Sequence, residues 1–294
     1  MKQLNALLKK ELKTNRGIFW LPVWVSAAFY ALVLISIAIA LIQGADVSFF
    51  NELKNQQPGA NNFGLYMAVL VATMVIGLVS LISVIGLADN VLNGDFKHRC
   101  EILHFSQPAS FGKIAFSKYL FTTLGAILLV GAVTLFNGLV ISGLFGVLFQ
   151  AQIQFGLVAW LQTWIVVSLQ LIVVASVVWL FAALFKQRSA QVMMLTFLVI
   201  EVSINLLNRA YGWQIPSPLR FLLGGTLHIN QSTMAAQDLA ASGKDAMSLI
   251  ISQMDNLISG LWQAIFNLKM LLKLAVSAVL TLGGVFIYKR RELV

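Results

Sequence analysis

One acidic residue stands inside a long apolar run of this sequence, where its carboxyl group has few polar neighbours. Glu201 lies midway along residues 191–208, and Asn205 and Asn208 follow it at helical spacing. An ionised carboxylate at the centre of a bilayer costs roughly 3 kcal/mol on insertion scales, so it must face other helices, pair or take up a proton. Glu201 and Asn205 form a candidate intramembrane polar site. It belongs either to a substrate or ion pathway or to hydrogen bonds between helices.

The residue types that catalysis and metal binding require are sparse and far apart. The three histidines are His98, His104 and His228, and Cys100 is the single cysteine. The chain contains no H-E-x-x-H pair, no nucleophile with a base at a readable spacing, and no G-x-x-x-x-G-K-[ST] phosphate loop. We therefore expect no catalytic, cofactor or metal site in this chain and no enzyme activity of its own. If ATP drives the protein, the nucleotide binds to another chain.

The composition predicts that these residues sit in an integral membrane protein. Of 294 residues, 59% are hydrophobic and 11% are charged, whereas soluble domains carry about 25% charged residues. The mean hydropathy is +0.85. Continuous apolar runs of about 20 residues indicate membrane-spanning helices. We expect one all-α transmembrane domain over 1–294 with six spans, at about 18–42, 63–88, 119–148, 157–185, 190–208 and 270–288.

The basic residues divide unequally between the two sides of this predicted bundle. One side carries 14 of the 20 Lys and Arg side chains, namely Lys2, Lys9, Lys10, Lys13, Arg16, Lys97, Arg99, Lys113, Lys118, Lys186, Arg188, Lys289, Arg290 and Arg291. Cytoplasmic loops are enriched in Lys and Arg. Both termini are therefore predicted to be cytoplasmic, in a multi-pass protein of the inner (cytoplasmic) membrane. The net charge of +9 is a topology signal, and nucleic acid is not an expected partner.

Two segments outside the predicted spans have amphipathic patterns. Residues 3–16 place leucines on one helical face and basic residues on the others, which is typical of a helix lying in the membrane interface and attracted to anionic headgroups. The external segment 209–269 repeats apolar residues at helical spacing in its second half, from Met247 to Leu268. This second pattern predicts a helix on the outer membrane surface or against a partner.

The connection 89–113, between the second and third spans, is the predicted docking segment. Asn93-Gly94 favours a turn. Residues 95–105 then place Phe96, Cys100 and Leu103 at helical spacing, with charged residues between them. A short amphipathic helix that projects from the cytoplasmic face is well suited to binding another protein.

These features together resemble the permease subunits of ABC transporters, specifically the ABC-2 type family. The resemblance rests on the basic leader, the six-span layout with both termini inside, and the charged stretch Asp95-Phe-Lys-His-Arg-Cys-Glu-Ile-Leu103. Ser106-Gln-Pro-Ala-Ser110 and then Lys113 and Lys118 follow, as in the family's proline-containing turn and basic entry into the third span. Tyr288-Lys-Arg-Arg-Glu-Leu293 is similar to the usual family ending. Many members have Gly-Thr where this chain has Arg99-Cys100.

The resemblance implies that two permease chains, identical or related, pair in the membrane and that each rests on an ATP-binding subunit. The segment 95–105 would be the coupling helix. Its expected contacts with that subunit are Asp95, Phe96, Arg99, Glu101 and Leu103, with Phe96 as the apolar anchor and Arg99 and Glu101 for orientation. Export is the expected direction, because the family consists mostly of exporters.

Two other functions remain open at the level of sequence. The chain could be a membrane anchor or force-transmitting subunit of an ABC-type complex that moves no substrate itself, with the external helix docked on a periplasmic partner. It could also be a secondary transporter or channel, for which Glu201 is the one supporting feature. The lipid bilayer is an expected partner in every case.

Overall fold

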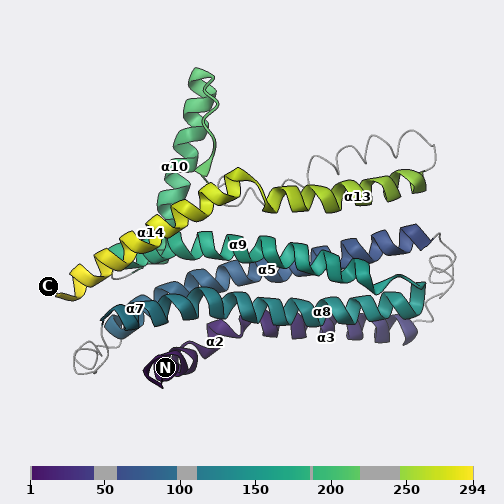
Figure 1. Cartoon of the computed structure of the whole chain (residues 1–294), viewed down its shortest axis with the longest axis horizontal. Coiled ribbons are helices and arrows are strands. Elements are labelled where there is room, and N and C mark those ends of the chain that lie inside the picture. Colours follow the sequence, from purple (N-terminus) through teal and green to yellow (C-terminus); the bar gives the residue numbers. More distant parts are fainter. Residues whose placement is uncertain (1, 43–57, 98–110, 186–187, 219–245, 294) are drawn as a thin grey trace.

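The computed structural model describes residues 2–42, 58–97, 111–185, 188–218 and 246–293, and every regular element in these ranges is helical (Figure 1). The elements are α1 Lys2–Thr14, α2 Arg16–Phe19, α3 Leu21–Ile42, α5 Pro58–Lys97, α7 Phe111–Leu120, the π-helical turn η1 Phe121–Gly125, α8 Ala126–Phe149, α9 Ile153–Leu184, α10 Ser189–Tyr211, α13 Ala246–Ile265 and α14 Leu268–Leu293. Both ends of the chain lie at the same end of the bundle, which we call the termini end (Figure 1).

Five of these helical stretches are long and apolar enough to cross a membrane, so the prediction of an all-α, multi-pass membrane protein is confirmed. They are Gly59–Gly94, Phe111–Phe149, Ile153–Leu184, Ser189–Tyr211 and Met254–Arg290, and Leu21–Ser36 is a shorter apolar helix. The first predicted span falls on this shorter helix, so the count of six stays a prediction. The chain turns between α8 and α9 at residues 150–152, within the polar stretch that separates the third and fourth predicted spans.

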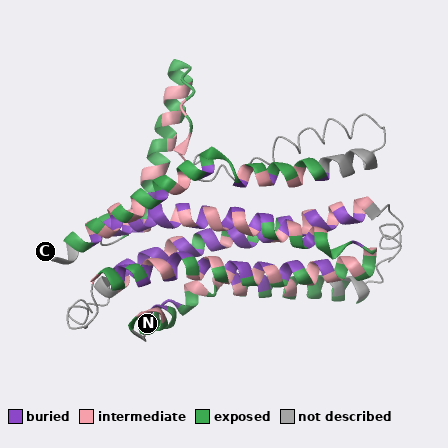
Figure 2. Cartoon of the chain, in the orientation of Figure 1, coloured by how far each residue is buried: buried purple, intermediate pink, exposed green. Residues whose placement is uncertain are grey.

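The core of the bundle forms where α5 and α9 pack along each other. Buried residues recur along both helices, shown in purple in Figure 2, and most of them are apolar. Leu65 and Tyr66 of α5 contact Ala159 of α9 towards one end, and Val84 of α5 contacts Leu171 of α9 further along. Helices α8 and α14 flank this central pair.

Small residues let neighbouring helices approach closely, which is how helices pack where lipid removes the hydrophobic drive between them. Gly131 of α8 lies directly against the indole ring of Trp164 of α9, and a Cβ atom at Gly131 would lie 2.7 Å from its Nε1. The indole has little freedom to move away. Its ring stacks on Trp160 at 5.6 Å, and its Nε1 donates to the Ile127 carbonyl at 3.2 Å.

The start of α5 holds the turn between α8 and α9. The Asn61 Nδ2 donates to the carbonyl of Phe149 at 2.9 Å, and the Asn62 Oδ1 accepts from the backbone N–H of Gln152 at 2.8 Å. Gln150 lies between these two contacts in the left-handed region, with φ 55°. Backbone groups that the helix ends leave open are thus satisfied by side chains of a third helix.

Helix α13 falls in the amphipathic stretch predicted within the external segment, and it packs on its own chain. It runs along the bundle beside α5 and α9 of its own chain (Figure 1). Met254, Leu261 and Ile265 are buried there, and the Ile258 carbonyl accepts from Gln162 Nε2 at 2.9 Å. Part of the apolar stripe that favoured a membrane surface or a partner is therefore covered by the protein's own central helices, while Leu268 is exposed.

The packing of α8 on α9 gives a matched pair of substitutions. Gly131→Ala places its Cβ against a fixed indole, so we expect it to lower the free energy of unfolding by about 1–3 kcal/mol, as overpacking does. Gly143→Ala, on the same helix with open space at its Cβ position, gains helix propensity of up to about 1 kcal/mol. Thermal unfolding in mild detergent measures both. An equal effect of the two substitutions would contradict the close α8–α9 contact.

Candidate functional site

Five buried polar side chains gather at the termini end of the bundle, and we call them the polar cluster. They come from four helices that are distant in sequence: Asp89 and Asn93 from α5, Lys118 from α7, Ser189 from α10 and Tyr288 from α14. Lys118 is 1% exposed and Asn93 is fully buried. Lysine is almost never so buried unless it is paired. The contacts of Lys118 are therefore central to the packing at this end of the bundle.

Lys118 joins α7 to α5 and α14. Its Nζ donates to the backbone carbonyl of Val91 at 2.6 Å and lies 5.9 Å from the centre of the Tyr288 ring. The same tyrosine ring packs at 5.2 Å against Phe111, the first residue of α7. A charge-assisted hydrogen bond and a cation–π contact thereby stabilise the buried ammonium group.

Asp89 joins α5 to the beginning of α10. Its Oδ1 accepts from Asn93 Nδ2 at 2.8 Å and from the hydroxyl of Ser189. Asn93 Nδ2 also lies 3.4 Å from the carbonyl of Phe185, at the end of α9. Arg188 adopts a left-handed conformation with φ 59° immediately before Ser189, and α10 begins at that serine, at the contact with Asp89.

The predicted turn at Asn93-Gly94 is wrong, because α5 continues through both residues to Lys97. The reason lies in the tertiary contacts of Asn93. Asparagine favours turns when its side chain bonds to the nearby backbone, whereas here the side-chain amide is engaged with Asp89 and with the far end of α9. The connection to α7 therefore begins later than the sequence predicted.

Two of the predicted contact residues for an ATP-binding subunit, Asp95 and Phe96, follow this cluster along α5. Asp95 and Phe96 belong to the last turn of α5, as its backbone shows. Arg99, Glu101 and Leu103 lie outside the described residues, as does the rest of the connection 98–110. What the structure describes is the two helix ends that flank this connection, and Lys118 bonds them together through the Val91 carbonyl.

Glu201 and Asn205 lie on α10, which stands away from the bundle over most of its length (Figure 1). The Glu201 carboxylate is half-buried and accepts from the hydroxyl of Ser217 at 2.6 Å. Asn205 is exposed and donates to the Glu201 carbonyl at 2.9 Å. Asn208 bonds both the N–H and the carbonyl of Ile215. Glu201 and Asn208 hold the segment after Gly212 against α10, an arrangement that serves local structure.

Polar side chains inside the bundle also join helices. Gln162 of α9 is fully buried and accepts from the Tyr66 hydroxyl of α5 at 2.7 Å, while its Nε2 donates to the Ile258 carbonyl of α13. Asn137 of α8 accepts from Ser26 of α3 at 2.9 Å. Within the described ranges, no three His, Cys, Asp or Glu residues lie together as a metal site would require. These polar side chains therefore act as hydrogen-bonding contacts between helices.

Sequence reasoning missed the polar cluster and could have found part of it. The sequence marks Lys118 only as a basic residue at the predicted entry to the third span, although it stands beside the apolar run that begins at Tyr119. A lysine at the start of a span and an aspartate near the end of the preceding span each indicate a polar group that needs a partner at that end of the bundle. The contributions of Ser189 and Tyr288 carry no comparable signal, because they depend on how α10 and α14 return to this end.

The burial of Lys118 leads to a second matched test. Lys118→Met keeps the apolar stem and removes the donor, leaving the Val91 carbonyl without its partner. We expect the free energy of unfolding to fall by about 1–3 kcal/mol, the cost of an unsatisfied buried group. Lys113→Met, at an exposed position of the same helix with a surface contact to Gln3, should change it by less than about 0.5 kcal/mol. Thermal unfolding of the two variants in detergent measures both changes in stability. Equal losses of stability would contradict the role of Lys118.

Comparisons with known proteins do not assign the chain to a family. No family model matches it, and no curated protein matches it. The class of the protein therefore rests on its long apolar helices.

Proposed function

We propose that this chain is the membrane-spanning permease subunit of an ATP-driven ABC transporter, with the layout of the ABC-2 type, and that it exports a substrate. A separate ATP-binding subunit would supply the energy. The proposal is supported by the all-helical, multi-pass architecture and by the excess of basic residues on one predicted side. In this proposal the termini end of the bundle faces the cytoplasm and lies at the inner membrane.

One observation carries the proposal furthest: the helix ends that flank the connection 98–110 are fastened together and to the rest of the bundle. Lys118 Nζ holds the Val91 carbonyl at 2.6 Å, and Asp89 extends the contacts to α10 through Ser189. A force applied to the connection would pass into α5, α7, α10 and α14 together. A coupling segment needs this property, because a loosely attached loop would absorb the movement.

The length of α5 also supports a docking role for the connection. Its 40 residues extend over about 60 Å at 1.5 Å per residue, whereas the hydrocarbon core of a bilayer is about 30 Å thick. The end that carries Asp95 and Phe96 is thus able to project into the cytoplasm. In the proposed complex Phe96 is the apolar anchor, Arg99 and Glu101 orient the segment, and Asp95 and Leu103 complete the contact.

The proposed mechanism is a two-state equilibrium biased from a distance. ATP binding would draw two ATP-binding subunits together and move the coupling segments of two permease chains. The shared polar cluster would carry that movement into the spans, shifting the bundle between inward-open and outward-open states. A second permease chain would have a surface to pack on at α10, because the apolar side chains of this helix are little covered by its own bundle (Figure 2).

Co-purification tests the proposal directly. The tagged chain, extracted from its own membranes in mild detergent, should retain a chain that carries a G-x-x-x-x-G-K-[ST] phosphate loop, identified by mass spectrometry. The retained chain should be released by Glu101→Arg, because this change reverses a charge in the proposed contact. A chain that comes out without any ATP-binding subunit would contradict the proposal.

A second test addresses the coupling segment. Phe96→Ala and Glu101→Arg should each weaken binding of the ATP-binding subunit by roughly 1–2 kcal/mol, about tenfold in affinity, as loss of an interface anchor does. Substrate-stimulated ATPase activity of the reconstituted complex should fall accordingly while expression is unchanged. Asp255→Arg, with the same change of charge at an exposed position on α13, is the matched control. Unchanged stimulation in both test variants would reject the assignment of 95–105.

A further inference from the structure

An apolar groove of about 780 Å³ runs between the N-terminal helices and the π-helical turn η1, which lies within the apolar stretch Phe111–Phe149. Leu8 and Leu12 of α1 and Trp20 form one wall, and Phe121, Leu124 and Leu128 form the other. Leu124 is 45% exposed and Leu128 is 59% exposed, so the groove is open along the side of α8. Its volume lies within the roughly 300–1,000 Å³ that is typical of small-molecule sites.

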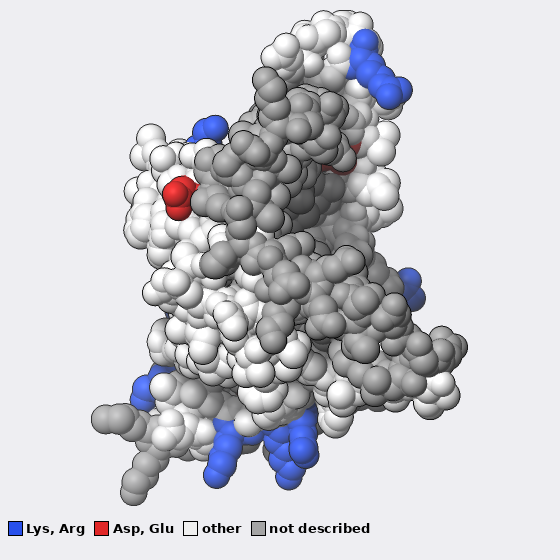
Figure 3. Space-filling model, turned by 90° about the vertical axis from the view of Figure 1, so that its right-hand side faces the viewer, with Lys and Arg blue, Asp and Glu red and all other residues white. Residues whose placement is uncertain are grey.

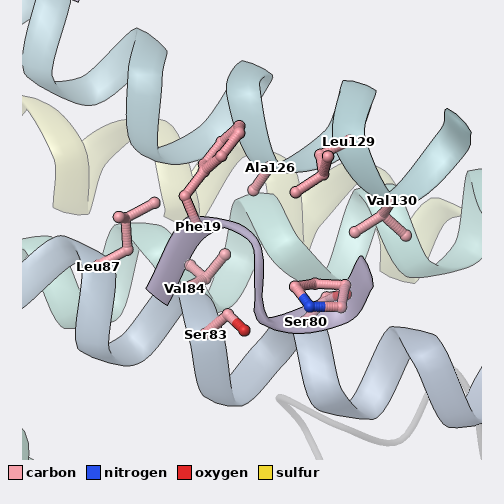
Figure 4. Close-up of a pocket in the computed structure, with 9 residues that line it drawn as sticks. Phe19, Ser80, Ser83, Val84, Leu87, Ala126, Leu129 and Val130 are labelled. Carbon is pink, nitrogen blue, oxygen red and sulfur yellow. The ribbon is translucent and has the colours of Figure 1, made fainter. Parts of the chain in front are cut away.

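The walls of this groove are held in place by the core. Leu8 and Phe19 pack with the buried Leu87, Val91 and Phe121. Phe19 stacks on Phe121 at 5.1 Å, and Figure 4 shows it inserted between α5 and α8 beside Leu87 and Ala126. The groove is therefore a built feature of the fold and not a gap beside a loosely attached leader.

The π-helical turn that forms the second wall is stabilised by hydroxyl groups. Thr122 donates to the Lys118 carbonyl at 2.8 Å, and Thr123 donates to the Tyr119 carbonyl at 2.7 Å. A π turn is rare and occurs frequently at functional sites. Here it ends directly before α8, where Leu124 and Leu128 line the groove.

The groove has a cationic rim on the side of α1. Lys9 lines it together with Asn5, and Lys13 and Arg16 are exposed nearby on the same N-terminal segment. Basic side chains gather at the edge of the molecule where α1 and α2 lie (Figure 3). The acid of this helix, Glu11, is 6% exposed and accepts from Asn15 Nδ2 at 3.3 Å, and it does not line the groove.

We propose that this groove binds an acyl chain of an anionic phospholipid from the surrounding membrane, with the lipid phosphate beside Lys9. The apolar walls match an acyl chain, and the basic rim matches a negative headgroup. The orientation also fits, because α1 lies across the long axis of the bundle at its end (Figure 1), where an interfacial helix would meet headgroups. This lipid site depends on the protein being in a membrane and is independent of the proposed transport function.

Native mass spectrometry tests the lipid site. The full chain, purified in mild detergent and incubated with phosphatidylglycerol and phosphatidylcholine of equal chain length, should retain one phosphatidylglycerol in preference. Lys9→Gln should lower this preference roughly fivefold, the effect of one basic side chain at a membrane surface. Lys289→Gln, at an exposed position of α14 at the same end of the bundle and outside the groove, is the matched control and should lower it less. Both are exposed positions, so neither change should disturb folding.

Filling the groove with a larger side chain gives a second test of the lipid site. Leu128→Trp should displace the retained lipid, whereas Leu139→Trp, at another exposed position of α8, should not. Equal retention of both lipids in every variant would mean non-specific annular lipid and would overturn the proposal. Equal losses in Lys9→Gln and Lys289→Gln, with no effect of Leu128→Trp, would mean surface attraction alone and would also overturn it. A lipid-free dimer that Leu128→Trp dissociates would assign the groove to a second copy instead.

Discussion

Polar groups inside an apolar environment must find their partners within the protein, and the rest of this structure depends on that constraint. Lys118 with Val91, Asp89 with Ser189, and Gln162 with Tyr66 are buried contacts between different helices, and the last two pairs join positions about 100 residues apart. Because lipid offers no water to replace a broken contact, each of these pairs fixes which helices are neighbours. The apolar surfaces around these pairs favour burial or contact with lipid, but they do not select which helix lies beside which.

The polar cluster concentrates these contacts at one end of the bundle. Four helices meet there through five buried side chains, while Asn61 and Asn62 bond the α8–α9 turn at the opposite end. In the proposed function, a bundle fastened in this way would transmit a displacement of the connection between α5 and α7 into its long helices. The same end carries α1, so a bound lipid and a docked subunit would act on one group of helices.

Some polar residues of this chain bond a neighbouring segment, and others join helices of the bundle. Glu201 was the candidate with the clearest sequence signal, yet its carboxylate holds a neighbouring segment through Ser217. Lys118 has the sequence signature of an ordinary basic residue at the entry to a span, yet it is only 1% exposed and lies at a junction of three helices. Isolation within an apolar run identified a residue that needs a partner. It did not identify the partner, or how many helices the partner joins.

The sequence by itself determined the all-α membrane class, the approximate extent of the long apolar helices and the amphipathic nature of α1 and α13. These follow from composition and periodicity, which are local properties of the chain. Only the tertiary structure decided that α5 runs through Asn93-Gly94, that α13 packs on α5 and α9, and that Lys118 and Asp89 reach the same end of the bundle. The physical reason is that buried polar contacts and close approaches such as Gly131 to Trp164 join residues whose positions along the chain carry no common pattern.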